Sequence, residues 1–212
     1  MTVGFFTGDN ISISEAEFLK DCDAALFIVK ELSFVRIKSE LNGEDDLFLK
    51  MGDISKRIKG VCFFSLLTDF CGVFKKSVAC YRSGKLVAIA DMNEQEGKFS
   101  ASYGLKSMTS GSLKFGVLVG RDILDIDRIR ALALTENDAI INLSADILDF
   151  DNEKLVSTIA YLGGLTIVSV NQTKKVIALN GGETLYSGRD KIFKQKIIIK
   201  KRYGERTSKI LI

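Results

Sequence analysis

The sequence predicts an α/β domain in which strands alternate with helices and with hairpins. Short, continuous apolar runs such as Ala24–Val29 are typical of strands that are buried on both faces. Apolar residues that recur at helical spacing, as over residues 45–58, indicate amphipathic helices between these runs. Turn signals at Arg82-Ser83-Gly84 and Asn180-Gly181-Gly182 add two hairpins. This mixture favours a mixed sheet with helices outside over a purely parallel, doubly wound sheet.

The expected elements follow one another along most of the chain. Ser14-Glu15-Ala16-Glu17 has the S-x-x-E spacing of a capping box, so it is expected to open a helix that ends near Cys22. The other expected helices cover about 45–58, 125–135 and 152–162. The expected strands are Thr2–Phe6, Ala24–Val29, Val61–Leu67, Ser77–Tyr81, Lys85–Ala90, Leu113–Val119, Ala139–Leu143, Leu165–Val170, two strands around 180–182, and Ile192–Lys200.

Length and composition limit the number of domains and the class of protein. A chain of 212 residues suits one domain over 1–212, and 46% hydrophobic residues are enough for a sizeable core. A net charge of +3 is too small to imply nucleic acid or a membrane as partner. No apolar run is long enough to span a bilayer, and no basic segment precedes the first one. We therefore expect a cytoplasmic protein with no signal peptide.

The cysteines and the absence of histidine exclude several kinds of chemistry. Cys22, Cys62, Cys71 and Cys80 lie far apart with no CxxC pair, so reduced and mostly buried thiols are expected. Without histidine, the chain cannot form a Ser-His-Asp or Cys-His catalytic pair by itself. No zinc site is indicated, and we expect neither a metal nor a cofactor.

The segment with the strongest site character runs from Lys114 to Leu134. The strand Leu113–Val119 ends at the turn Gly120-Arg121-Asp122, and an amphipathic helix follows. Sites in open α/β sheets lie at such places, because strand ends and helix N-termini expose backbone N–H groups. The turn itself carries no nucleophile. Its acidic residues are interpreted as a helix cap and a local pair of Asp127 with Arg130, rather than as metal ligands.

This segment resembles the nitrilase, or carbon–nitrogen hydrolase, superfamily. The family's strand reads roughly K-I-G-V-x-I-C-Y-D, followed by a short turn, P-E and an Arg about three residues later. Aligned without a gap, the chain matches this pattern at Lys114, Gly116, Val117, Asp122 and Arg130, with Asp127 in place of the Glu.

Other family patterns resemble this chain in the same order. Residues 23–31 are similar to a G-A-D-(apolar)-F-P-E run, 76–92 to a hairpin that begins N-S-A, and 137–141 to a G-A-D-L-I strand. Residues 164–171 are similar to a strand that ends in Asn, and 180–189 to a later hairpin. The resemblance covers nearly the whole chain. It implies a four-layer α-β-β-α sandwich with two mixed sheets and, by analogy, a homodimer.

The resemblance also implies which catalytic roles are kept. Family members use a Glu as general base, a Cys as nucleophile and a Lys that stabilises the oxyanion. Glu31 falls on the base position, and its side chain either remains in a pocket or faces solvent after its strand. The Lys position falls on Met92, or on Asp91 with a one-residue slip, and neither supplies a cation. The Cys position is Gly120, which has no side chain.

The function implied is that of a degenerate, catalytically inactive homologue that binds a ligand or a partner. A small amide or carboxylate is expected near Glu31 and Gly120, with Arg121 and Asp122 as further binding candidates. Glu96 is a binding candidate as well, since Glu94 and Glu96 lie near a second Glu of some family amidases, although a charged loop explains them more simply.

Two other functions are weighed beside it. The first is an active amidase-type hydrolase with a displaced nucleophile, for which Cys71 in a loop-like segment is the exposed thiol candidate. The second is nucleic-acid binding through the basic C-terminus, including the tail at about 200–212. An edge strand guarded by lysines explains the basic stretch as well and is favoured, and no interleaved aromatic residues support single-strand binding.

Overall fold

The computed structural model describes residues 1–93, 97–101, 104, 106–145 and 152–199. Its strands are β1 (Thr2–Gly8), β2 (Ala24–Val29), β3 (Phe34–Arg36), β4 (Val61–Phe70), β5 (Val73–Arg82), β6 (Lys85–Asp91), β7 (Lys106–Ser110), β8 (Leu113–Val119), β9 (Ala139–Leu143), β10 (Thr166–Val170), β11 (Lys175–Ala178), β12 (Thr184–Gly188) and β13 (Ile192–Lys196). Its helices are α1 (Ile13–Phe18), α2 (Ile37–Leu41), α3 (Leu47–Ser55), α4 (Ile126–Leu134) and α5 (Asn152–Gly163), with 3-10 turns η1 (Lys30–Leu32) and η2 (Gly120–Leu124).

The strands form two mixed sheets. The first sheet has the order β13-β1-β2-β4-β5-β6, with β3 paired to β4, and the second has the order β12-β11-β10-β9-β8-β7. Parallel strands occupy the middle of each sheet: β1, β2 and β4 in the first, and β8, β9 and β10 in the second. Antiparallel hairpin strands extend both sheets, and β13 adds an antiparallel edge strand to the first sheet. The two mixed sheets implied by the resemblance are thus confirmed.

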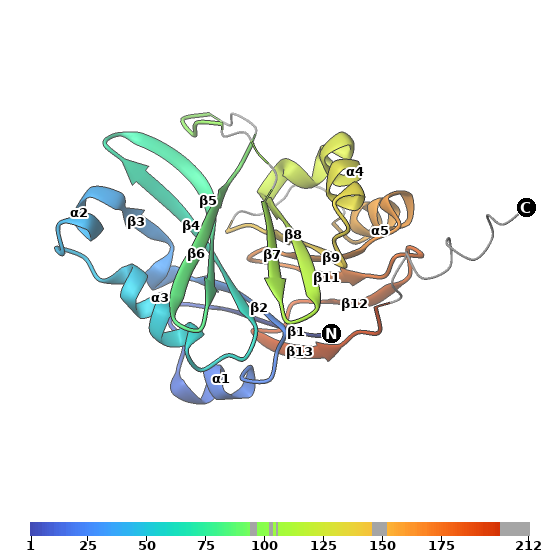
Figure 1. Ribbon diagram of the computed structural model, residues 1–212, viewed down its shortest axis with the longest axis horizontal. Coiled ribbons are helices and arrows are strands. Elements are labelled where there is room, and N and C mark those ends of the chain that lie inside the picture. The colour runs from blue at the N-terminus through green and yellow to red at the C-terminus, as the bar shows by residue number, and fades with distance from the viewer. Residues whose placement is uncertain (94–96, 102–103, 105, 146–151, 200–212) are drawn as a thin grey trace, which may run out of the picture.

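Figure 1 shows the four layers of the fold, and three separate apolar cores lie between them. The central core lies between the sheets and includes Phe63 and Phe115, whose rings meet edge to face at 6.2 Å. A second core packs the first sheet against α1 and α3, and a third packs the second sheet against α4 and α5. The strands of both sheet centres are apolar on both faces for this reason. The α-β-β-α sandwich implied by the resemblance is therefore confirmed.

The start of the first helix differs from the sequence prediction by two residues. Ser12, not Ser14, is the N-cap, and its hydroxyl accepts a hydrogen bond from the Glu15 amide at 3.2 Å. The Glu15 carboxylate in turn accepts from the Ser12 amide at 2.8 Å. Both Ser12 and Ser14 satisfy S-x-x-E, so the motif alone could not separate them. The earlier start lets Glu15 also pair with Lys191 at 2.8 Å.

The largest miss in the strands is the length of the β4–β5 hairpin. Residues 68–72 have the composition of a loop, yet the strands pair up to Phe70 and Val73, leaving a two-residue turn. That turn is formed by Cys71 and Gly72 with φ of 53° and 88°, the positive values that a type I′ hairpin turn requires. The sequence also did not predict β3, α2 and β7, which are short and lack a complete apolar period.

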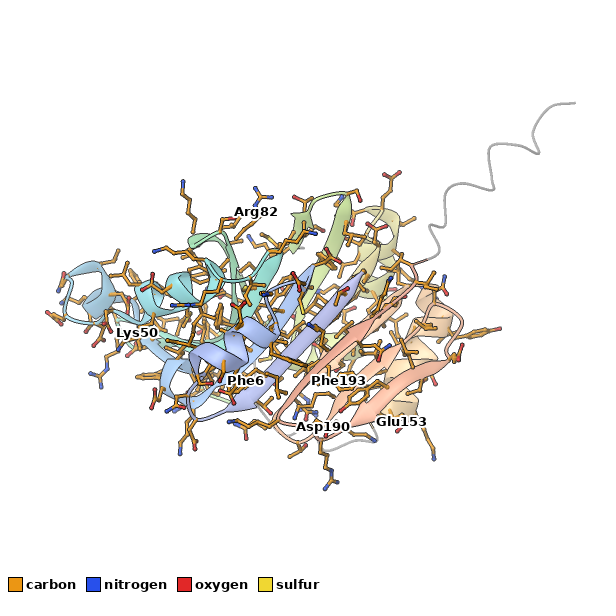
Figure 2. The ribbon with its side chains drawn as sticks, turned by 90° about the horizontal axis from the view of Figure 1, so that it is seen from below. Phe6, Lys50, Arg82, Glu153, Asp190 and Phe193 are labelled. Carbon is orange, nitrogen blue, oxygen red and sulfur yellow. The ribbon has the colours of Figure 1, made fainter. Side chains whose placement is uncertain are left out.

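The last described strand lies at an edge, as its lysines indicated. β13 is the first strand in the order of the first sheet and has β1 as its neighbour. Figure 2 shows these two strands side by side, with Phe6 and Phe193 labelled. Lys194 donates to the Phe18 carbonyl at 2.9 Å, and Lys191 pairs with Glu15. The basic residues of β13 therefore protect an edge strand and anchor α1. The tail at 200–212 lies outside the described residues. No described helix has the length and apolar character to cross a membrane.

One lysine is buried between the two sheets at the beginning of β11. Lys175 on β11 is 1% exposed and precedes Ile177 of the central core by two residues, so its side chain points between the sheets. Burial lowers the pKa of its ammonium group, and the charge of Asp190 opposes that lowering only in part. The charged form is thus less stable in the folded chain than in the unfolded chain.

We expect Lys175→Met to raise the free energy of unfolding by about 1 kcal/mol at pH 7. The folded-state pKa of Lys175 is lowered, so the unfolded chain binds more protons over the interval between the two pKa values. Stability of the parent should therefore rise with pH up to the ordinary lysine value of about 10.4, and the variant should lose that rise. Urea unfolding between pH 7 and 10.5 measures how the free energy of unfolding of each protein changes with pH. The same pH dependence in parent and variant would contradict the prediction.

Candidate functional site

The carboxyl ends of the parallel strands of both sheets meet at one end of the sandwich. An open groove of about 560 Å³ lies there, lined by residues at the ends of β1 and β2, by residues that follow β1, β2, β9 and β10, and by Leu67 of β4. A small cavity of about 10 Å³ adjoins it and shares Leu67 and Ala145 with the groove wall. The groove has the size of a small-molecule site, whereas the cavity has room for about one water-sized group.

The turn after β8 adopts a conformation that suits glycine. Gly120 has a φ of 57°, in the left-handed region where a side chain costs roughly 1–2 kcal/mol. A Cβ atom at Gly120 would lie 3.4 Å from Ser144 Oγ and 3.6 Å from Met92 Sδ. The structure thus brings Gly120 and Met92 close together. Met92 is 1% exposed and belongs to the central core, so a thioether and not a cation faces the turn.

Asp122 fixes the position of this turn. Its side chain is 1% exposed and accepts hydrogen bonds from the Asn93 backbone amide and the Asn93 side-chain amide, both at 3.0 Å. The Val119 amide donates to the same carboxylate at 3.4 Å, and Arg128 Nη1 lies 3.5 Å from it. Asp122 therefore ties the loop after β6 to the turn after β8 and to α4, and its acceptor atoms are engaged by the protein.

The other acidic residues of the segment have local roles. Asp125 is the N-cap of α4 and accepts from the Arg128 amide at 3.1 Å, which confirms the predicted cap. Asp127 lies 3.5 Å from Arg130 in a pair that is exposed on both sides, which confirms the predicted local pair. These carboxylates are accounted for by the start of the helix.

The remaining candidate residues lie apart from the turn. Glu31 is exposed on η1, and although its backbone amide donates to the Asp9 carbonyl at 3.0 Å, its side chain is not part of the groove wall. Its neighbour Lys30 does line the groove. Arg121 is exposed beside Gly120. Glu96 lies outside the described residues.

The structure adds a cation that the sequence did not suggest. Lys76 on β5 is 9% exposed and lines the small cavity together with Ser65, Ser77 and Ser144. It shares the inward face of β5 with Val78 and Cys80, two and four residues later. This period-two alignment was the available signal: a lysine in register with buried apolar residues. By the resemblance, Lys76 stands where the family pattern begins with Asn.

Three of the four cysteine thiols are buried, and one is exposed. Burial raises the pKa of Cys22 and of Cys80 to about 12, and it raises the pKa of Cys62 further. Such thiols remain protonated and unreactive at neutral pH. Cys71 is exposed in the β4–β5 turn and is not part of the groove wall.

We expect a disulfide reagent to modify one thiol of the native protein rapidly and all four in denaturant. Thiolates react and protonated thiols do not, so the rapid reaction should be that of Cys71. The absorbance of the released thiolate measures the number of groups. Cys71→Ser should abolish the rapid reaction, while Cys80→Ser should leave it unchanged. A second rapid thiol would contradict the assignment of the buried cysteines.

The similarity of this chain to known proteins is found in its structure. No protein-family model matches the sequence, and no curated protein matches it. Among solved structures, an amidase from Nesterenkonia sp. AN1 has a TM-score of 0.76 at 13% identity, covering 93% of this chain and 93% of the amidase. A variant of that amidase, with acrylamide added at its active-site cysteine, has a TM-score of 0.75 at 13% identity over 93% of both chains.

A larger enzyme contains the same fold. The glutamine-dependent NAD⁺ synthetase from Acinetobacter baumannii, in complex with ADP, has a TM-score of 0.70 at 17% identity. The match covers 91% of this chain but 44% of the synthetase, so this chain spans less than half of that enzyme. The chain therefore has the carbon–nitrogen hydrolase fold of the nitrilase-superfamily amidases. The fold resemblance drawn from the sequence is confirmed, and at these identities the similarity is one of fold.

Proposed function

We propose that this chain is a catalytically inactive protein of the nitrilase type that acts as a binding module. The observation that carries the proposal is the turn at Gly120. In the sequence alignment this turn stands at the cysteine position of the family, and Gly120 brings no nucleophile to it. Losing the nucleophile removes several orders of magnitude in rate.

The surroundings of Gly120 support the same proposal. The alignment puts the oxyanion-stabilising lysine at Met92, whose sulfur lies 3.6 Å from the place of a Cβ on Gly120. A buried thioether cannot stabilise the negative charge that develops on a carbonyl oxygen. The exposed side chain of Glu31 is also poorly placed to act as a general base in the groove. The nucleophile and the oxyanion-stabilising cation are therefore absent from their aligned positions, and the general base is poorly placed.

The binding role rests on the groove. Its volume of about 560 Å³ lies within the range of small-molecule sites, and it opens at the carboxyl ends of the parallel strands, where α/β folds bind ligands. We propose that a small amide or carboxylate ligand occupies it.

The test is release of ammonia from a panel of amides, including butyramide, by purified protein. We expect no release above the uncatalysed rate. Glu31→Gln and a matched exposed control, Glu183→Gln, should behave like the parent. Ammonia release that Glu31→Gln abolishes and Glu183→Gln preserves would overturn the proposal. It would establish an active hydrolase with a displaced nucleophile, which single Cys→Ala changes would then locate.

We propose in addition that two copies associate through the outer face of α4 and α5, as the resemblance implies. Leu134, Tyr161 and Leu162 are large, mostly exposed residues on these helices. Sedimentation should give a dimer, and Tyr161→Lys together with Leu162→Lys should give a folded monomer. A monomeric parent at micromolar concentration would refute this arrangement.

A further inference from the structure

The first sheet has an uncovered face where it extends past the second sheet. Figure 1 shows the outer half of the β4–β5 hairpin, with β3 beside it, extending away from the second sheet. Leu67 of β4 points inward, because it lines the small cavity together with Val119 of the second sheet. Phe34 of β3 is paired with Leu67, and paired residues point to the same side of a sheet. Phe34 is 40% exposed, so the inward face is open to solvent at this end.

Three phenylalanine rings lie on this open face. Strand pairing aligns Arg36 of β3, Asp69 of β4 and Phe74 of β5 in one row across the sheet. Phe99 continues this row, because it forms a parallel bridge with Phe74. Phe34 lies two residues before Arg36 and therefore on the same face, and both Phe74 and Phe99 are partly exposed. Aromatic rings on neighbouring strands of an open sheet are a platform on which nucleic-acid bases stack.

Two exposed cations accompany these rings. The Arg36 guanidinium lies 5.8 Å from the centre of the Phe34 ring. The Lys98 ammonium lies 4.9 Å from the centre of the Phe74 ring and 5.7 Å from that of the Phe99 ring. Both side chains are long and exposed, so each reaches the phosphate of a nucleotide whose base stacks on the adjacent ring.

The accessible charge of this face is positive. Within the described part of the chain, neither Arg36 nor Lys98 forms an ion pair with a carboxylate. Asp69 is the acidic residue on the face, and its carboxylate accepts a hydrogen bond from the Gly72 amide at 2.7 Å. Lys76 lies on the same face but is buried, so it is not placed to reach a phosphate. Two accessible cations against one engaged carboxylate complement a polyanion.

We propose that this aromatic–basic face, made of Phe34, Arg36, Phe74, Lys98 and Phe99, binds single-stranded nucleic acid. Bases stack on the rings, and the two cations contact phosphates. A duplex is excluded from this mode of binding, because its bases are already stacked on one another. An anionic lipid surface would be contacted by the cations alone, because rings on the inward face of a sheet do not reach into a bilayer.

The experiment titrates a fluorescein-labelled oligothymidylate of about 12 nucleotides with the full chain and follows the fluorescence anisotropy. We expect saturable binding that weakens as the salt concentration is raised from about 50 to 200 mM. A duplex of the same length should bind more weakly by about tenfold or more.

Two variants separate the stacking contribution from the charge contribution. Phe34→Ala should weaken binding by about fivefold or more and leave its salt dependence unchanged, since no charge is removed. Arg36→Gln should reduce the slope of log K against log salt by about 0.7, the value for one phosphate contact on a single strand. Phe18→Ala is the matched control, because Phe18 on α1 is 47% exposed and has the Lys194 ammonium 4.8 Å from its ring centre. This control and Arg130→Gln should bind like the parent.

Phe34→Tyr keeps an aromatic ring and should retain the parent's affinity, which distinguishes stacking from a defect in folding. Unchanged binding in both Phe34→Ala and Arg36→Gln would overturn the proposal and favour the basic residues of the C-terminus. Equal affinity for the single strand and the duplex would overturn it as well. Vesicles of phosphatidylserine and phosphatidylcholine are the third probe. Binding to these vesicles without binding to the oligonucleotide would identify a lipid surface instead.

Discussion

Replacing Asp122 with alanine is expected to lower the free energy of unfolding by roughly 3–5 kcal/mol. The carboxylate is 1% exposed and accepts from Asn93 and Val119, so its removal leaves buried amide donors without an acceptor. It also leaves Arg128, whose side chain is 16% exposed, without the more deeply buried of its two carboxylate partners. Urea unfolding followed by circular dichroism measures the loss.

The matched control is Asp127→Ala in the same segment. Asp127 also lies 3.5 Å from an arginine, but this pair is exposed on both sides. Surface pairs of this kind contribute about 0–1 kcal/mol, so the control should unfold within about 0.5 kcal/mol of the parent. Equal losses in the two variants would show that Asp122 is not the residue that holds the turn.

The contrast between these two aspartates shows what the sequence could and could not predict about the site. The spacing in the segment 114–134 predicted the strand, the turn and the helix correctly, because apolar period and caps are local signals. Nothing local distinguishes Asp122 from Asp127. Burial of Asp122 arises from Asn93, which is 29 residues earlier in the chain, and such a contact requires the packed fold.

The same distinction applies to Glu31 and Lys76. Glu31 ends a buried strand and could be interpreted from sequence either as a pocket carboxylate or as a solvent-facing charge. The structure gives it an exposed side chain, since η1 directs Lys30 and Ser33 toward the groove instead. Lys76 is the reverse case, a charged residue that a composition-based interpretation assigns to the surface. Its burial follows from strand register, which becomes predictable once the full extent of β5 is known.

The four layers of the fold were implied by the resemblance to the nitrilase superfamily. The local signals, continuous apolar strands alternating with amphipathic helices and hairpins, predicted a mixed sheet with helices outside. Elements without such a signal were missed. β3 has three residues with the burial pattern exposed, buried, exposed, and it is held by parallel pairing with the extended end of β4. Its existence depends on the β4–β5 hairpin extending beyond the point where the sequence predicts a loop.

Introducing a cation at Met92, which the sequence alignment places at the family's lysine position, is the second change with a large expected effect. Met92→Lys should lower the free energy of unfolding by roughly 3–5 kcal/mol at pH 7, because two to four pKa units of lowering are typical of a lysine buried in an apolar core. Met92 is 1% exposed among the apolar residues of the central core. The introduced ammonium would face Gly120 and Ser144, which offer one side-chain hydroxyl and no carboxylate.

The pH dependence separates this electrostatic loss from a packing defect. The introduced lysine has a lowered pKa when folded, so the unfolded chain binds the additional proton and the deficit should shrink as the pH rises toward about 10.4. Met92→Leu, which keeps the volume and adds no charge, should lose about 1 kcal/mol or less at every pH. Urea unfolding of both variants from pH 7 to 10.5 measures the difference. If Met92→Lys were as stable as Met92→Leu at pH 7, the turn would still accommodate a cation, and the core would not have closed over the catalytic position that the alignment assigns to Met92.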